Sequence, residues 1–307
     1  MSIQRKFIKS LVSVSLLSVT AWVQAATITV TIPPLAGMVA PILHQDDRLN
    51  ILLDNGVSPH GFQLKPKDIK TLADSDLALL VGTPVDAWAQ KVANKAAHQA
   101  SMVDVPNLFV LQKRNHFAWV IEQAHEHHHK NYNYDGHLWL SYQNTTAFIE
   151  AVSKQLMQIH PEQAQYYQAR TQHWLAQLSQ AYQQVAKSLE PYQNSAFLVL
   201  HDGFQYFEQQ FSLKGVGALR LNPEMAPSLK HILALRKRMS EQQVQCIFKE
   251  PQFPEKNIQM LVKNQSIRVG ELDPMGSLWA QSQGYLNYDD YLLTMGKAFS
   301  ECLGGQR

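Results

Sequence analysis

Five histidines stand close together near the middle of this chain of 307 residues. His125, His127, His128 and His129 lie in a polar run without helical or strand periodicity, and His137 follows where a regular apolar pattern resumes. Neutral imidazole is the commonest side-chain ligand for metals, and three histidines with one oxygen donor complete the tetrahedral shell of Zn²⁺. The number and spacing of these side chains therefore indicate metal chemistry.

Three more candidate ligands follow short apolar runs elsewhere in the chain. His60 lies after the run at 50–53, while His201 and Asp273 each follow an apolar run directly. In open parallel sheets, ligands collect beyond the carboxyl ends of the strands, where loops lead into helices. A lone histidine more often packs or hydrogen-bonds than binds a metal. On the residues alone, a packing role for His60, His137 and His201 therefore stays open.

Strand-like runs alternate with helical patterns on both sides of the histidine segment. Strands are expected at 27–32, 50–53 and 77–81, weakly at 101–103, and at 196–200, 216–221, 246–249 and 267–272. Helices are expected at 35–43, 66–73, 85–97, around 147–156, at 227–238, at 254–262 and from residue 288 to the C-terminus. This alternation predicts an α/β fold of two lobes, each a parallel sheet flanked by helices, with a cleft between them.

A long segment without glycine or proline separates the two sets of strands. From Glu162 to Glu190 apolar residues recur at helical spacing, which predicts a helix of roughly 40 Å at 1.5 Å per residue. We interpret it as a rigid connector along both lobes rather than a dimerisation helix, because its apolar positions keep no strict heptad. The predicted order is a first lobe at 26–160 with a histidine-rich loop at about 116–134, a connecting helix at 161–190 and a second lobe at 191–307.

The first 25 residues have the pattern of a secretory signal peptide. Arg5, Lys6 and Lys9 precede an apolar run at 11–23, and a small-x-small pattern ends at Ala25. No cysteine lies near that position, so the mature chain would carry no lipid there. An outer barrier must retain a freely soluble exported protein near its cell, which indicates a Gram-negative periplasm and no membrane anchor.

Cysteine content and charge narrow the class of protein further. The chain has two cysteines, Cys246 and Cys302. An even number of cysteines in an oxidising compartment makes a disulfide the default expectation and two buried thiols the alternative. Removing the three positive charges of the signal peptide takes the formal net charge from +2 to −1. From that charge we expect neither a nucleic-acid partner nor a general affinity for anionic surfaces.

Several segments in a fixed order carry recognisable motifs. They are Gly56-Val57-Ser58-Pro59-His60, Leu64-Lys65-Pro66-Lys67-Asp68, the histidine-rich loop, Asp135-Gly136-His137-Leu138-Trp139, His201-Asp202-Gly203-Phe204-Gln205-Tyr206-Phe207 and Leu272-Asp273-Pro274-Met275-Gly276. Together they resemble the substrate-binding proteins of zinc ABC importers, of the ZnuA type, over essentially the whole mature chain. The resemblance implies that His60, His137 and His201 are the primary zinc ligands. It also implies the long connecting helix and a disulfide between Cys246 and Cys302.

The chain departs from these relatives at two positions near the expected site. Pro59 stands where some zinc-specific relatives have a glutamate, so that oxygen donor is missing, and Gly136 stands where proline often precedes the second histidine. The fourth ligand is therefore expected from Asp273 or from water, although Asp273 could equally cap the turn before Pro274. Relatives selective for manganese usually have a carboxylate where His201 stands, which favours zinc here.

The histidine-rich loop has a separate expected role. Histidines at successive and alternate positions can gather metal transiently without a fixed geometry. We interpret His125, His127, His128 and His129 as a low-affinity zinc antenna on an exposed polar loop, with a sensor of excess zinc as the alternative. Because the loop is internal, it is not an expression tag.

These observations predict a monomeric periplasmic protein that captures Zn²⁺ and passes it to an inner-membrane ABC permease, without enzymatic activity. A component of a manganese or iron importer is the nearest alternative. An exported zinc hydrolase is a weaker one, because the chain has no Gly-x-Ser-x-Gly elbow and no acid that is an obvious general base. Ligands drawn from both lobes would tie metal affinity to the relative position of the lobes.

Overall fold

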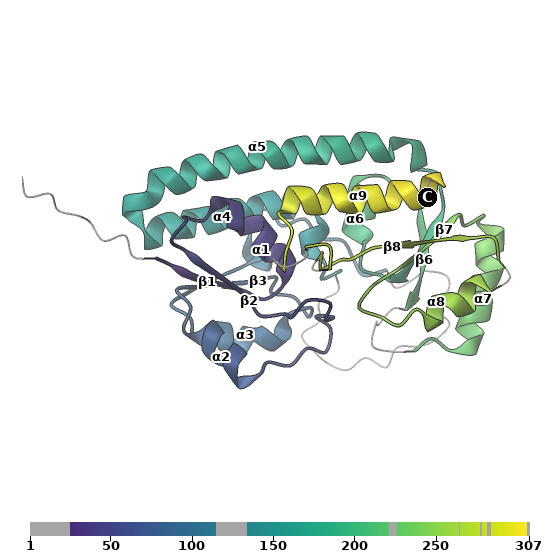
Figure 1. Ribbon diagram of the computed structural model, residues 1–307, viewed down its shortest axis with the longest axis horizontal. Coiled ribbons are helices and arrows are strands. Elements are labelled where there is room, and N and C mark those ends of the chain that lie inside the picture. Colours follow the sequence, from purple (N-terminus) through teal and green to yellow (C-terminus); the bar gives the residue numbers. More distant parts are fainter. Residues whose placement is uncertain are drawn as a thin grey trace, which may run out of the picture.

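The chain forms two lobes that lie beside each other and are joined along one side by two long helices (Figure 1). The computed structural model describes residues 25–114, 134–220, 226–263, 265–276, 278–280 and 284–305. Each lobe contains a four-stranded sheet, and the strands within each sheet pair in parallel. This arrangement confirms the predicted two-lobed α/β fold.

The first sheet has the strand order β2-β1-β3-β4. Its strands and the helices between them are β1 (Thr27–Val30), α1 (Pro33–Val39), β2 (Arg48–Ile51), α2 (Pro66–Ala73), β3 (Leu77–Leu80), α3 (Ala87–Ala93) and β4 (His98–Ser101). The residues of β3 are all apolar and all buried, as expected for an inner parallel strand that is covered on both faces. α1 begins with Pro33 and Pro34, whose fixed φ suits the first turn of a helix.

The strand that was weakly predicted at 101–103 lies earlier in the chain. β4 covers His98–Ser101, and Met102–Asp104 form a short 3-10 helix, η2. β4 is an edge strand, and its first two residues, His98 and Gln99, are polar and exposed. The sequence prediction is wrong here because an exposed edge needs no apolar pattern.

The second sheet has the order β6-β5-β7-β8. Its elements are β5 (Phe197–His201), α6 (Gln205–Gln210), β6 (Gly215–Arg220), α7 (Leu229–Glu241), β7 (Cys246–Lys249), α8 (Lys256–Val262) and β8 (Arg268–Glu271). β5 is buried along its whole length and ends at His201. α6 is absent from the predicted helices, because six residues are too few to show a helical period.

Three longer helices complete the fold, namely α4 (Tyr142–Ile159), α5 (Ala164–Leu189) and α9 (Tyr288–Gly304). In the first lobe, the indole of Trp174 on α5 donates a hydrogen bond of 2.9 Å to the carbonyl of Met38. In the second, the hydroxyl of Tyr182 donates one of 3.3 Å to the carbonyl of Gln210. α5 therefore runs along both lobes (Figure 1), as the sequence predicts.

α9 packs along α5 and shares its role (Figure 1). Gly296 allows the close approach, since a Cβ atom there would lie 2.8 Å from Cγ1 of Val185. A disulfide joins Cys246 on β7 to Cys302 on α9, with a Cα–Cα distance of 5.9 Å, and confirms the predicted bond. The main apolar core continues from the sheet of the first lobe through α5 to α9 and the sheet of the second.

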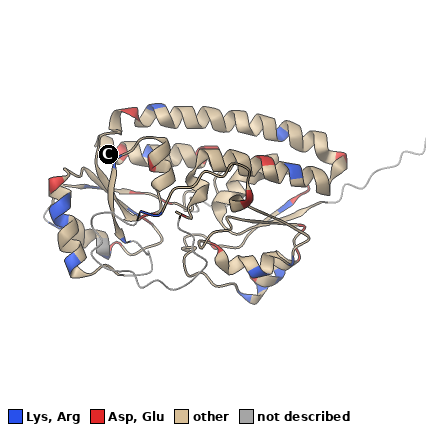
Figure 2. Cartoon of the chain, turned by 180° about the vertical axis from the view of Figure 1, so that it is seen from behind, with Lys and Arg blue, Asp and Glu red and all other residues tan. Residues whose placement is uncertain are grey.

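The outer surface carries charges of both signs. Lys, Arg, Asp and Glu are interspersed over both lobes in the view of Figure 2. Among the described helices, none is long and apolar enough to cross a membrane.

Candidate metal centre

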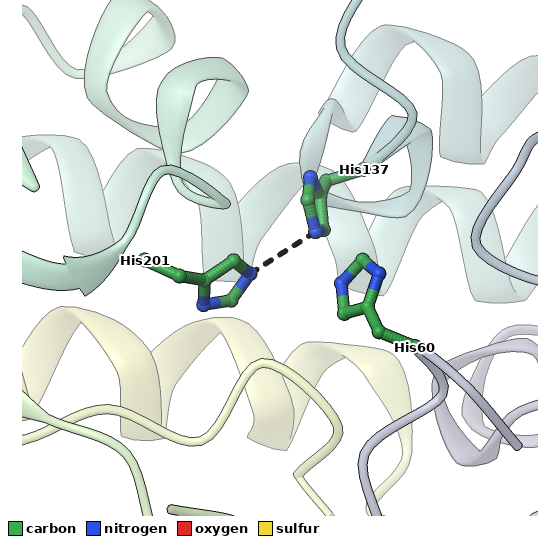
Figure 3. A group of neighbouring side chains, drawn as sticks. All are labelled: His60, His137 and His201. Carbon is green, nitrogen blue, oxygen red and sulfur yellow. Dashed lines mark hydrogen bonds between the residues drawn. The ribbon is translucent and has the colours of Figure 1, made fainter. Parts of the chain in front are cut away.

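The three predicted histidines meet between the two lobes (Figure 3). One ring nitrogen from each of His60, His137 and His201 lies within 4.8 Å of the other two. Each side chain comes from a different connection. His60 lies in the loop between β2 and α2, His137 precedes the 3-10 helix η3 (Leu138–Leu140), and His201 ends β5. Strand ends therefore account for His60 and His201, whereas His137 joins them from the residue directly before η3.

His201 is held by a buried carboxylate. Its Nδ1 lies 2.6 Å from Oε1 of Glu250, and its backbone nitrogen donates to the same oxygen at 3.1 Å. Because an ionised carboxylate can only accept, Nδ1 carries the hydrogen and Nε2 faces the other two imidazoles. Gly203 leaves room for this ring, since a Cβ atom there would lie 2.4 Å from Nε2 of His201.

His137 is held in the same way by Asp135. Its Nδ1 lies 2.6 Å from Oδ1 of Asp135, which also accepts from the backbone nitrogen of His137 at 3.0 Å. The Nε2 atoms of His137 and His201 are 3.2 Å apart (Figure 3). Two ligands at 2.0–2.1 Å from a tetrahedral zinc ion lie roughly 3.3 Å from each other. The spacing of this pair therefore matches one edge of a zinc tetrahedron.

His60 is less tightly held than the other two. Its backbone nitrogen donates to Oγ of Ser58 at 3.2 Å, and the side chain is only partly buried. The carbonyl of the preceding Pro59 accepts a hydrogen bond of 3.1 Å from the indole of Trp88, which fixes the end of the loop. This contact uses the backbone of residue 59, so it does not depend on the proline side chain.

The pKa values of two of the imidazoles move in opposite directions. Burial lowers the pKa of His60, and the neighbouring His137 and His201 lower it further, so the neutral, metal-binding form is favoured. Burial alone would also lower the pKa of His201, but the charge and hydrogen bond of Glu250 outweigh it and raise the pKa.

Further buried charges surround the three histidines. Nη1 of Arg114 lies 3.3 Å from Oδ1 of Asp202, and its Nη2 lies 2.5 Å from Oε2 of Glu208. Both carboxylates are almost completely buried. Burial raises the pKa of Asp202 to about 7 against the opposing charge of Arg114, and it also raises the pKa of Glu208. The charges of Glu250, Asp202 and Asp135 all act to raise the pKa of His201, while Arg114 pairs with Asp202 and Glu208.

Asp273 does not belong to the group that the structure brings together. Its Oδ1 accepts hydrogen bonds from Nε2 of Gln252 at 2.6 Å and from the backbone nitrogen of Met275 at 3.0 Å. Its Oδ2 accepts from the backbone nitrogen of Leu278 at 3.0 Å. These contacts fit the turn-capping role that the sequence left open, because backbone nitrogens of the loop after β8 donate to both oxygens, and Gln252, which lies after β7, adds a third hydrogen bond.

The remaining predicted site residues are outside the part of the chain that the structure describes. They are the histidine-rich loop residues His125, His127, His128 and His129.

Sequence reasoning missed the two carboxylates that orient the imidazoles. Asp135 stands two residues before His137, and Glu250 directly follows β7, at the same edge of the sheet as His201. The second position could have been found, because the strand-end rule that selected His201 also applies to Glu250.

Comparisons with known proteins identify the family and the fold. The model of the family "zinc-uptake complex component A, periplasmic" (ZnuA) matches residues 28–300. The high-affinity zinc uptake system protein ZnuA of Yersinia pestis is 28% identical over 294 residues, covering 91% of this chain and 92% of that protein. A crystal structure of ZnuA has a TM-score of 0.76 at 20% identity, covering 91% of this chain and 100% of that one. The periplasmic zinc binding protein TroA from Treponema pallidum has a TM-score of 0.76 at 19% identity, with coverage of 91% and 99%, so both structures share the fold.

Proposed function

Because this chain belongs to the family of periplasmic zinc-uptake complex component A, we propose that it captures Zn²⁺ in the periplasm and delivers it to an inner-membrane ABC permease. The observation that supports this proposal most is the meeting of His60, His137 and His201 between the lobes. Two of these rings are oriented by carboxylates so that Nε2 faces the common space. A site built in this way binds a metal of tetrahedral preference and holds it away from bulk water.

The proposed ligands are His60, His137 and His201, with water in the fourth position. Asp273 is left out of the set because its oxygens are already hydrogen-bonded within its own loop. We propose a carrier rather than an enzyme. The buried carboxylates Asp135 and Glu250 are bound to Nδ1 atoms, where they orient ligands, and neither is placed as a general base toward a fourth ligand.

The proposed export is supported by the start of the fold. Ala26 is buried, and its backbone nitrogen donates a hydrogen bond of 3.0 Å to Oδ1 of Asp47. An amino terminus created by cleavage near Ala25 would keep that contact and add a charge to it. We also propose that the mature protein acts as a monomer, divided into lobes at 26–160 and 191–307 around the connector at 161–190.

Titration of the metal-free mature protein with Zn²⁺, in the presence of a competing chelator, tests the proposed site. We expect one tight site, and a loss of affinity of more than about 100-fold in His60→Ala, His137→Ala and His201→Ala. Loss of a ligand should exceed the roughly 10–100-fold effect that follows the loss of a residue orienting a ligand. The matched control is His173→Ala, which removes an exposed histidine from α5 and should leave the affinity unchanged.

Two results would contradict the proposal. Unchanged zinc affinity in folded His201→Ala would show that the site is elsewhere, and tighter binding of Mn²⁺ than of Zn²⁺ in competition would favour the manganese alternative. Delivery itself is measured by growth under zinc limitation of cells that lack the protein. The unchanged chain should restore that growth, and His201→Ala should not.

A further inference from the structure

Arg114 reaches from the chain segment that carries His137 to the strand end that carries His201. Its Nη1 donates to Oδ1 of Asp202 at 3.3 Å, and its Nη2 donates to Oε2 of Glu208 at 2.5 Å. The side chains of Arg114, Asp202 and Glu208 are 21%, 10% and 4% exposed, so solvent screens their charges only weakly. The ion pairs join parts of the chain that are 88 and 94 residues apart.

On the side of Arg114, which donates these hydrogen bonds, backbone pairing connects Arg114 to the segment of His137. Gln112 and Tyr134 form an antiparallel bridge, and the backbone nitrogen of Asp135 donates to the carbonyl of Leu111 at 2.8 Å. Asp135 in turn holds both the ring and the backbone of His137. A displacement of Arg114 would therefore be transmitted to the imidazole through a short, hydrogen-bonded segment.

On the acceptor side, the two carboxylates flank the connection that follows His201. Asp202 is the next residue, and Glu208 lies on α6. Tyr206 on the same helix adds a second link, since its hydroxyl donates to the carbonyl of Asp135 at 2.9 Å and accepts from the backbone nitrogen of Leu111 at 3.2 Å. α6 is thus joined to the His137 segment by an ion pair and by a neutral hydrogen-bonded bridge.

A buried carboxylate needs a partner, but the partner need not come from another part of the molecule. Glu208 is 3% exposed, and leaving it unpaired would be strongly unfavourable. A cation on α6 or a neighbouring strand of the second lobe would satisfy it locally. Arg114 instead comes from the opposite side of the site, so the arrangement of the two sides is fixed by charge as well as by packing.

We propose that Arg114 is a positioning residue that sets the separation of His137 and His201. This inference rests on the proposed zinc-binding function. By tying both histidine-bearing segments together, the guanidinium holds the two Nε2 atoms near the edge length of a zinc tetrahedron before the ion arrives. Weakening the ion pairs of Arg114, for example by docking of a partner, would increase the distance between the Nε2 atoms of His137 and His201 and favour release of zinc.

The test compares Arg114→Lys with the double change Arg114→Gln and Glu208→Gln. The double variant removes both charges of the Arg114–Glu208 pair together, so no unpaired carboxylate remains on α6 to unfold the protein, and only the more exposed Asp202 loses its cation. Arg114→Lys keeps the charge but cannot span both acids with one planar fork. Arg268→Gln is the control, since Arg268 joins β8 to α9 through the carbonyls of Cys302 and Leu303 inside the second lobe.

Each protein is measured for zinc affinity by chelator competition and, with Co²⁺ alone, for the visible absorption bands that report four-coordinate geometry. We expect the double variant to lose about tenfold or more in zinc affinity, with weakened bands, and Arg114→Lys to recover part of both. Arg268→Gln should lose stability only. Unchanged affinity and spectra in both Arg114 variants would overturn the inference. The proposed function would stand in that case if the unchanged protein bound zinc tightly and His201→Ala did not.

Discussion

At the scale of single residues, the site depends on which nitrogen of each imidazole is engaged. Asp135 and Glu250 each accept a hydrogen bond from an Nδ1 atom, so Nε2 remains the donor atom for a metal. The negative charge that orients His201 also makes the ring more basic, and it raises the pKa above the ordinary value of 6.5. A more basic imidazole binds zinc more strongly, and it competes for protons at higher pH.

Glu250→Gln separates these two effects of the carboxylate. A proton and Zn²⁺ compete for Nε2 of His201, so affinity is complete above the pKa of the zinc-free ring and falls as the pH drops through it. Because that pKa is raised, the unchanged protein should begin to lose affinity above pH 6.5. Glutamine removes the charge, so the midpoint should move to lower pH, and affinity at high pH should fall by about 10–100-fold.

Zinc titrations from pH 5 to pH 8 with a competing chelator measure this change. The matched control is Glu271→Gln, which removes a carboxylate at the end of β8 whose partner is Lys249, at 3.3 Å. It should leave both the midpoint and the affinity in place. An unchanged midpoint in Glu250→Gln would show that another group governs the pH dependence.

At the scale of elements, a covalent bond between β7 and α9 attaches the second lobe to the helices that span the molecule. The disulfide between Cys246 and Cys302 closes a sequence separation of 56 residues. In the chain-entropy model, a loop of that length corresponds to about 4 kcal/mol of stabilisation, and measured values are typically 2–4 kcal/mol. The bond lies between a strand and a helix, and neither carries a proposed ligand.

Replacing both cysteines by alanine should therefore lower stability without removing the metal site. We expect the free energy of unfolding to fall by about 2–4 kcal/mol, measured by urea denaturation. Reduction of the unchanged protein should give a comparable loss, which serves as the control. Zinc should still bind at one tight site, and loss of that site from the folded variant would show that the disulfide positions a ligand.

At the scale of the whole molecule, the two lobes share one apolar core. Buried residues of both sheets belong to a single cluster with α5 and α9, for example Ile28 of β1, Phe197 of β5, Trp174 of α5 and Phe299 of α9. The proposed ligands also come from both sides of the interface. We therefore expect the described lobes to unfold together, and zinc to stabilise the molecule as a unit.

Calorimetry of the metal-free protein with and without Zn²⁺ measures this coupling. A free zinc concentration of 100 times the dissociation constant should add about 2.7 kcal/mol, which corresponds to a rise in Tm of roughly 5 °C for a chain of this size. His201→Ala should show a much smaller rise at the same zinc concentration. Two separate transitions, of which zinc shifts only one, would contradict a shared core.

The sequence by itself determined the local structure and the type of chemistry. Apolar runs placed the inner strands, the segment between two prolines predicted α5, strand ends indicated His60 and His201, and the family resemblance added His137 to the ligand set. These features can be predicted because they depend on neighbouring residues and on one geometric rule for parallel sheets.

Only the tertiary structure decided which partners each side chain has. Glu250 meets His201 across 49 residues, and Arg114 meets Asp202 across 88, distances that no local period encodes. Asp273 also follows a strand end, yet Gln252 and two backbone nitrogens of its own loop hydrogen-bond its oxygens. Ligand type is therefore a property of the sequence. The orientation of His201 depends on Glu250, a residue distant in sequence, and that contact exists only once β5 and β7 have paired in the second sheet.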